Sequence, residues 1–342
     1  MKTVFYKELT HVALEINTTF QNQRIHQAQD IFRGAILRQP GIVIYNAVGQ
    51  IICFSVIEIN SFKRGHLWYG PVIKSDYDLE SVLRAMLRAL FEFNIWHLTL
   101  HSSDYEIYAA IKNLVKGKQI SLAMEKESVA IAIKKIDGLN ETQLLKTYKT
   151  RLRKSLAIAK ENHLVVNKIK TRENVNELGE LFVNMYMHRG ISMDFGAYKD
   201  RLLSDMNYVL DTGKGSIFGA YLNNTCIGCS VQIYHGDTAY YLCAATDKSY
   251  DFPIMHLIVH KAILEAMQSG YTYFDFGSYY PETIDKQLMG LNVFKNAFGI
   301  EVMKKPPTVI IGYKKMHLTF IHWLVGFKNL VLGMSGKKSV NL

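Results

Sequence analysis

Alternating apolar and polar positions, broken by a short turn, occur twice along the chain and form its most regular pattern. The first instance is IVIYNAVGQIICFSVIEI from residue 42, and the second is IFGAYLNNTCIGCSVQIY from residue 217. Apolar, β-branched runs that flank a Gly or Asn turn are typical of two paired antiparallel strands. The sequence therefore predicts one β-hairpin in each half of the chain.

An internal repeat connects the two hairpins. They align at an offset of 175 residues, and the same offset aligns the apolar positions of a following amphipathic helix. With one residue inserted, the strand WHLTLH from residue 96 meets TYFDFG from residue 272. The repeat predicts a duplicated unit of hairpin, third strand, helix and fourth strand, in which residues 42–100 superpose on 217–276.

A helix that leads into a strand in each half indicates an α/β protein with a mixed, partly parallel sheet. We therefore expect an N-terminal domain over residues 1–138, a C-terminal domain over 139–313 and a separate amphipathic tail over 314–342. Ligands of such sheets bind where strands end or splay apart. The segment YFDFGSYY, which begins as a strand and breaks at Gly277, lies at such a place.

Composition predicts a globular protein, with 49% hydrophobic residues and six prolines in 342 residues. The first residues carry charges where a signal peptide is apolar, so we expect a cytoplasmic location. Cys226 and Cys229 form a C-x-x-C, but positions three apart on a strand face opposite sides of the sheet. His256 and His260 lie one helical turn apart without a third ligand. The sequence thus favours reduced thiols and no metal site.

The net charge of +10 and the pI of about 9.2 point to an anionic partner. The densest cationic segment is KTYKTRLRKSLAIAKENH, which reads as a helix. Its charges fit two interpretations: the solvated face of a surface helix, or contact with phosphates of a nucleic acid, a nucleotide or lipid headgroups. The cationic residues are Lys146, Lys149, Arg151, Arg153, Lys154 and Lys160.

Several motifs together resemble those of the Fem-type (FemABX) aminoacyltransferases. They are GPVIKSD, the basic RLRKSLAIAKENHLVV helix, MYMHRG, and YFDFGS followed by GLNVFKNAFGIEV, set within two similar halves. The resemblance covers roughly residues 1–312 and implies two tandem GNAT-like domains. It further implies transfer of an amino acid from aminoacyl-tRNA to the amine of an anionic peptidoglycan precursor, with no tightly bound cofactor.

Two departures leave the acyl donor open between aminoacyl-tRNA and acyl-CoA. Residues 139–170 provide one helix and no counterpart of the long helical arm with which some Fem proteins contact tRNA. GNAT enzymes that use acetyl-CoA carry R/Q-x-x-G-x-G/A before a helix, where backbone amides hold the pyrophosphate. Neither GPVIKSDYDLES nor AATDKSYDFPIM contains that loop.

The expected chemistry is direct attack of an amine on an acyl ester or thioester. It requires a splayed strand pair, a donor to the developing oxyanion and a path for the proton. Lys295 is the candidate cationic partner of the acyl carbonyl or donor phosphate, unless it snorkels at the surface between core phenylalanines. Asp275 is the candidate to orient the amine or accept its proton, unless it caps the turn at Gly277.

Five further residues are candidates for substrate binding. By the resemblance, Arg189 holds an anionic acceptor, although a structural ion pair fits it equally. Tyr279 and Tyr280 line the acceptor groove or are ordinary loop aromatics. Phe294 flanks Lys295. Tyr241 faces the cleft if its neighbour on the strand faces away.

Three functions remain as hypotheses. The first is an N-acyltransferase that acts on a cell-envelope precursor, and the second is a GNAT-like acetyltransferase that uses acetyl-CoA on a sugar or small amine. The third is a non-catalytic module that binds nucleic acid or a membrane surface. The apolar tail KKMHLTFIHWLVGFKNLVLGMSGKKSV is too short to span a bilayer. It fits a final packed helix, or a helix at the inner face of an anionic membrane.

Overall fold

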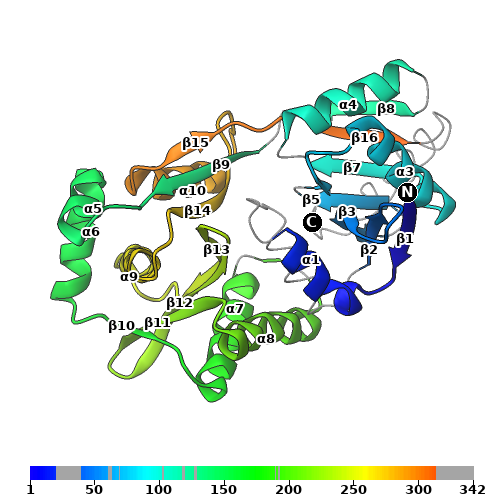
Figure 1. Ribbon diagram of the computed structural model, residues 1–342. Helices are drawn as coiled ribbons and strands as arrows, with labels where there is room; N and C mark the ends of the chain where they lie inside the picture. Colours follow the sequence, from blue (N-terminus) through cyan, green and yellow to red (C-terminus); the bar gives the residue numbers. More distant parts are fainter. Residues whose placement is uncertain are drawn as a thin grey trace. The chain divides into compact units, whose positions relative to one another are not determined.

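The computed structural model divides into two compact units (Figure 1). Of the described residues, those up to 126 together with 305–312 form unit 1, and those from 129 to 304 form unit 2. The described residues are 1–20, 40–60, 64–68, 70–101, 104–117, 120–126, 129–188, 190–191 and 193–312.

Unit 2 is built on a seven-stranded sheet of order β10-β11-β12-β13-β14-β9-β15. Neighbouring strands are antiparallel except β13 and β14, which run parallel. Asn223 and Asn224 both have positive φ between β11 and β12, which is the backbone of a type I′ hairpin turn. The strands are β9 (Ala130–Lys135), β10 (Val165–Lys168), β11 (Gly215–Leu222), β12 (Thr225–His235), β13 (Thr238–Thr246), β14 (Tyr273–Tyr279) and β15 (Glu301–Met303).

Helices cover both faces of this sheet (Figure 1). Apolar residues of α6 and α9 share one core with Phe274 and Phe276 of β14 and with Phe298, just after α10. The other face is covered by α7 and α8, which contact β11, β12 and β13. The helices are α5 (Glu141–Thr147), α6 (Thr150–Glu161), α7 (Arg172–His188), α8 (Phe195–Thr212), α9 (Ile254–Gln268) and α10 (Lys286–Ala297).

Unit 1 contains a four-stranded sheet, β1-β2-β3-β6, and a five-stranded sheet, β4-β5-β7-β16-β8. Its core lies between these strands and the helices α3 and α4. The strands are β1 (Lys2–Tyr6), β2 (Gly41–Tyr45), β3 (Ile51–Val56), β4 (Glu58–Asn60), β5 (Arg64–Trp68), β6 (Val72–Ile73), β7 (His97–His101), β8 (Ser121–Lys126) and β16 (Thr308–Gly312). The helices are η1 (Leu9–His11), α1 (Ala13–Thr19), α3 (Leu79–Glu92) and α4 (Tyr105–Lys116).

The two units repeat one architecture, as the sequence predicts. The antiparallel series β1-β2-β3 of unit 1 matches β10-β11-β12 of unit 2. The parallel pair β5 and β7 matches β13 and β14, and α3 and α9 each precede the second strand of that pair. Both predicted hairpins are present, and the expected α/β class with two GNAT-like units is confirmed.

Two strands at the junctions between the units, here called the exchanged strands, pair away from their neighbours in the chain. β16 makes unit 1 discontinuous in sequence, whereas β9 begins the continuous unit 2. β9 directly follows β8 of unit 1 in the chain, yet it pairs between β14 and β15 of unit 2. β16 follows β15 of unit 2, yet it pairs between β7 and β8 of unit 1.

The division of the structure therefore differs from the boundaries expected at residues 138 and 313. Both exchanged strands are short apolar runs, AIAIKK and TVIIG, whose side-chain pattern suits a central position in either sheet. Their partners are distant in sequence, so no local signal assigns them. The tail over 314–342 lies outside the described residues.

Candidate active site in the second unit

The parallel strands β13 and β14 separate partway along their length. Their pairing covers Thr238 with Tyr273, Ala239 with Phe274 and Tyr240 with Asp275. Beyond that last pair, β13 continues to Thr246 and β14 to Tyr279 without pairing to each other. The opening between them is a splay of the kind that the expected chemistry requires.

A bulge lies on each strand at the splay. In β13, Tyr241 pairs with Gln232 and Cys243 with Val231, so Leu242 has no partner of its own on β12. In β14, the register against β9 shifts between Asp275 and Ser278, and Gly277 within that shift has φ +75°. A β-bulge leaves backbone groups outside the regular ladder and bends the strand. Glycine adopts the positive φ at Gly277 without the strain of a side chain.

Asp275 lies at the last paired position, 3% exposed, and caps the bulge. Its Oδ1 accepts a hydrogen bond from the Gly277 backbone N–H at 2.6 Å. The turn cap, one of the two roles that the sequence leaves open, is therefore present. The Asp275 charge also acts on the Lys295 ammonium. The structure thus brings these two candidates to the same bulge.

Lys295 is a buried lysine, 7% exposed, near the end of α10. Its Nζ donates to the carbonyl oxygen of Ser278 at 2.5 Å. Burial lowers the pKa of Lys295 to about 8, and the Asp275 carboxylate partly opposes that shift. The side chain does not snorkel into water, so the surface interpretation of Lys295 does not hold.

One face of α10 clamps the part of β14 beyond the bulge. Asn292 donates through its amide to the Tyr280 carbonyl at 2.6 Å and accepts from the Tyr280 N–H at 3.1 Å. Asn296 donates to the Tyr279 hydroxyl at 2.9 Å. Sequence analysis missed both asparagines. In the pattern N-x-x-K-N, the spacing places the two asparagines and Lys295 on one face of the helix. That pattern is the sequence signal that identifies them.

Three of the aromatic candidates pack against the hydrophobic core of unit 2 beside the splay. Tyr241, Tyr279 and Phe294 are half-buried and pack against the same apolar core. The ring of Phe294 lies 5.1 Å from that of His256, between ring centroids. Burial is the main cause that raises the pKa of Tyr241. Tyr240 is 2% exposed, so it is Tyr241 that remains the partly open member of the pair.

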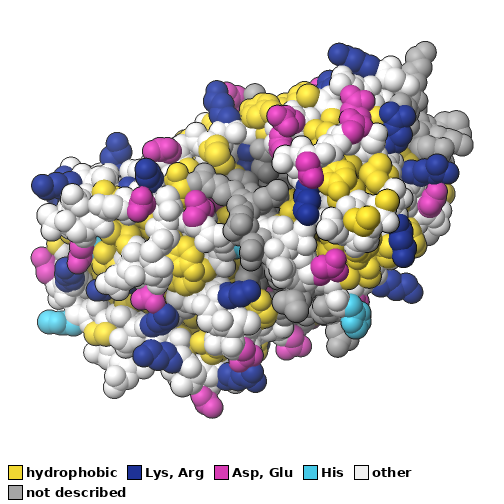
Figure 2. Space-filling view, viewed as in Figure 1, with side chains coloured by type: hydrophobic (Ala, Val, Ile, Leu, Met, Phe, Trp, Pro, Cys, Tyr) yellow, Lys and Arg dark blue, Asp and Glu magenta, His cyan; other side chains and the backbone are white. Residues whose placement is uncertain are grey.

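The basic helix α6 presents most of its cations to solvent. Leu152, Leu156 and Ala159 are buried, whereas Arg151 and Lys154 are exposed. Arg153 instead donates to the Tyr148 carbonyl at 2.8 Å, beside the end of α5. Arg151 lies near His256, whose pKa is lowered to about 4 by burial and by the Arg151 charge. Figure 2 shows blue cationic side chains interspersed with magenta acidic ones on the visible face, rather than gathered into one field.

A second buried lysine holds the C-terminal end of α10. Lys134 of β9 is 3% exposed and donates to the Thr147 hydroxyl at 2.8 Å and to the Gly299 carbonyl at 3.2 Å. Burial lowers the pKa of Lys134 to about 8. Gly299 has φ +66°, and a Cβ there would stand 2.3 Å from the Thr147 carbonyl oxygen. This close approach fixes α10 against the junction of α5 and α6.

The remaining sequence candidates do not contribute to the site that the structure describes. Arg189 lies outside the described residues. Cys229 is buried, Cys226 is half-buried, and burial raises the pKa of each thiol. Within the described parts of the chain, no group of three His, Cys, Asp or Glu side chains is arranged to hold a metal ion. Across those same residues, no helix combines the length and the apolar character needed to cross a membrane.

The fold and the splayed strands are those of a GNAT-type acyltransferase domain. Residues 145–283, within unit 2, match the family model for the acetyltransferase (GNAT) domain. That match supports the enzyme class that the sequence predicts, an acyltransferase. No curated protein sequence matches the chain.

Solved structures extend the likeness to most of the chain. A crystal structure of FemX has a TM-score of 0.65 at 13% identity, over 90% of this chain and 97% of FemX. L-PGS from Bacillus licheniformis has a TM-score of 0.62 at 12% identity, over 94% of this chain and 98% of L-PGS. A tandem GNAT protein from the clavulanic acid biosynthesis pathway has a TM-score of 0.52 at 8% identity, over 91% of this chain and 98% of that protein. The chain therefore has the tandem GNAT-like fold that Fem-type proteins share.

Proposed function

We propose that the protein transfers an acyl or aminoacyl group to an amine by direct attack, in the splay between β13 and β14 of unit 2. The observation that carries this proposal is the buried ammonium of Lys295 at the β14 bulge, beside Asp275. A buried cation costs free energy, and such groups are concentrated where charge develops during a reaction. The other buried lysine of this unit, Lys134, donates to Thr147 and Gly299, whereas Lys295 donates at the bulge itself.

In the proposed reaction the acyl carbonyl enters the opening beyond the Tyr240 and Asp275 pair. The acceptor amine attacks the carbonyl carbon, and the new oxyanion is stabilised by the Lys295 ammonium and by backbone N–H groups at the Leu242 bulge. The C–O or C–S bond to the donor then breaks, and the leaving oxygen or sulfur receives the proton that the amine loses. No enzyme nucleophile takes part.

The donor binds at the start of α9 in this proposal. Pro253 is the N-cap of α9, and no side chain caps that end, so its first amides can hold a phosphate. Arg151 lies near His256 in the first turn of α9 and adds positive charge. The preceding segment DKSYDFP contains no glycine to cradle the pyrophosphate of a coenzyme A. This favours an aminoacyl ester of tRNA as donor, with no tightly bound cofactor.

The acceptor in this proposal is the amine of an anionic cell-envelope precursor, as in the Fem-type enzymes whose fold the chain shares. Tyr279 and Tyr280 line its groove, and Arg189 provides the positive charge. Such a precursor would make the protein bacterial and place it in the cytoplasm, at the inner face of the membrane. A second candidate, acetyl transfer from acetyl-CoA to a sugar or small amine, is supported by the family match over residues 145–283.

The first test identifies the donor and acceptor by mass spectrometry. The purified protein is incubated with aminoacyl-tRNA or acetyl-CoA together with peptidoglycan precursors or amino sugars, and acceptor mass gains are recorded. Lys295→Met should reduce transfer on the order of a hundredfold, because a preorganised charge in a dry site contributes a few kcal/mol. Lys286→Met, an exposed lysine at the start of the same helix, is the matched control. Equal rates for the two variants would exclude a role for Lys295 in transfer.

A further inference from the structure

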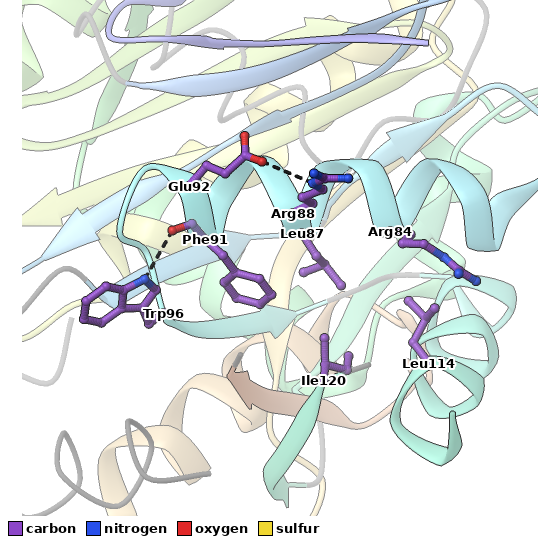
Figure 3. A pocket seen from close by; sticks show the side chains of 8 residues that line it. All are labelled: Arg84, Leu87, Arg88, Phe91, Glu92, Trp96, Leu114 and Ile120. Carbon is purple, nitrogen blue, oxygen red and sulfur yellow. Dashed lines mark hydrogen bonds and ion pairs between the residues drawn. The ribbon is translucent and has the colours of Figure 1, made fainter. Parts of the chain in front are cut away.

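Unit 1 contains a pocket of about 510 Å³ that the proposed transfer does not use. It lies along α3, between that helix, the end of α4 and Ile120, which precedes β8 (Figure 3). Its volume falls within the range of small-molecule sites, roughly 300 to 1,000 Å³.

The floor of the pocket is apolar. Leu87 and Phe91 point from successive turns of α3 toward Ile120, and Leu114 of α4 adds a further aliphatic side chain (Figure 3). Trp96 forms one end and is 37% exposed. Its indole N–H donates to the Phe91 carbonyl at 3.2 Å, so the exposed part of the ring presents only hydrocarbon. An occupant therefore meets an aliphatic and aromatic surface without hydrogen-bonding groups.

The rim of the pocket carries two arginines with different partners. Arg88 donates to the Glu92 carboxylate one turn later at 3.2 Å, so that charge is neutralised locally. Arg84 makes no hydrogen bond or ion pair with another described residue, and its charge helps to lower the pKa of the exposed Asp78. Arg84 lies two turns from Phe91 on α3, about 10 Å along the helix axis. The pocket thus offers an uncommitted cation at one end and an apolar body at the other.

This distribution discriminates between classes of ligand. A nucleobase or sugar would bury polar edges against Leu87 and Ile120 without hydrogen-bond partners, which is unfavourable for each unmet group. A neutral hydrocarbon would leave the Arg84 guanidinium unused. A chain with a hydrocarbon body and one anionic end satisfies both features.

We propose that this pocket binds a single-chain amphiphilic anion, with its carboxylate or phosphate on Arg84 and its hydrocarbon chain along Phe91 toward Trp96. The ligand is taken up as a free molecule rather than as part of a bilayer, because the chain lies along the helix in a pocket. Binding at this place is independent of the transfer site in unit 2.

The test uses the full chain and decanoate below its micellar concentration, measured by titration calorimetry and by tryptophan fluorescence. Decanoate should bind and change the fluorescence, whereas decanol and acetate should each bind at least tenfold more weakly. Arg84→Gln should weaken decanoate binding at least tenfold. Lys112→Gln, a cation of α4 that pairs with Glu125 and does not line the pocket, is the matched control and should change binding less than threefold. Trp96→Phe should abolish the fluorescence change while calorimetric binding persists.

Location is tested separately with a decanoate analogue that carries a photoreactive diazirine. Labelled peptides should contain residues 84–96 or 114–120. Labelling confined to other segments, including the apolar sequence after residue 312, overturns the proposal. Equal loss of affinity in Arg84→Gln and Lys112→Gln, or equal binding of decanol and decanoate, also overturns the proposal. Because the readout is ligand binding in unit 1, it stands apart from any result on acyl transfer.

Discussion

At the scale of single residues, the second unit buries two lysines at cost to its stability. Lys295 was predictable from FKNAFG, because a cation between apolar residues after an interrupted strand indicates a site. The hydrogen bond from Lys295 to Ser278 was not predictable, since this bond depends on the bulge at Gly277. Lys134 gave no signal, because its strand AIAIKK ends in two lysines and the sequence does not show which one faces inward.

The burial of Lys295 has a measurable effect on stability. Its pKa falls from 10.5 to about 8 in the folded state, so between these values the unfolded chain binds more protons than the folded one. The free energy of unfolding therefore rises as the pH increases from 8 to 10.5, as far as this group is concerned. At pH 7 the burial of the Lys295 ammonium lowers that free energy by about 3 kcal/mol. We expect Lys295→Met to increase the unfolding free energy at pH 7 while it reduces transfer.

Chemical denaturation at pH 7, 9 and 10 measures this effect. The difference between Lys295→Met and the native protein should be largest at pH 7 and shrink toward pH 10. The exposed Lys286→Met should show no such trend. A Lys295→Met protein that is less stable at every pH would show that the buried ammonium stabilises the fold, contrary to this account.

At the scale of elements, α10 positions the site because one of its faces and its C-terminal end are both anchored. Asn292, Lys295 and Asn296 attach it to β14, and Lys134 attaches its C-terminal end to β9. Hydrophobic periodicity predicted the hairpins and the helix α9 well, since those signals are local. It could not predict the two bulges, because a bulge is defined by the register of a partner strand that lies elsewhere in the sequence.

We expect Lys134→Met to loosen the end of α10. Loss of the ammonium removes the cation from the Gly299 carbonyl at the helix C-terminus, where positive charge is favourable. Amide hydrogen exchange over residues 295–300 should become roughly tenfold faster, as expected for about 1.4 kcal/mol of local stability. Lys135→Met, the exposed neighbour on the same strand, provides the control. If both variants leave exchange at α10 unchanged, Lys134 does not anchor the helix.

At the scale of the whole molecule, the two units share one strand order but have diverged in chemistry. The helix after the parallel pair carries a Lys-Asn sequence in each unit. In α4, Lys112 pairs with Glu125 near the surface, whereas in α10 Lys295 is buried at the bulge. The repeat was visible in the sequence through hairpins and apolar helix positions. The pairing of the exchanged strands β9 and β16 could not be predicted, because the sequence of a short apolar strand does not specify which distant strands it pairs with.

The strand exchange predicts which fragments fold alone. Residues 129–304 contain every strand of the seven-stranded sheet, from β9 to β15. We expect this fragment to unfold cooperatively on heating and to give dispersed amide NMR signals. Residues 139–304 follow the boundary expected from sequence but lack β9. β15 then loses the one strand it pairs with, and β14 loses its antiparallel neighbour.

The shorter fragment should therefore remain largely unfolded under conditions in which residues 129–304 are folded, because unpaired backbone groups in a central strand are costly. The same reasoning applies to residues 1–128, which lack β16 between β7 and β8. Lys126 and Thr308 are direct partners in that ladder, so joining 1–126 to 308–312 through a short turn should restore the missing strand. Equal thermal stability of fragments 129–304 and 139–304 would contradict the assignment of β9 to unit 2.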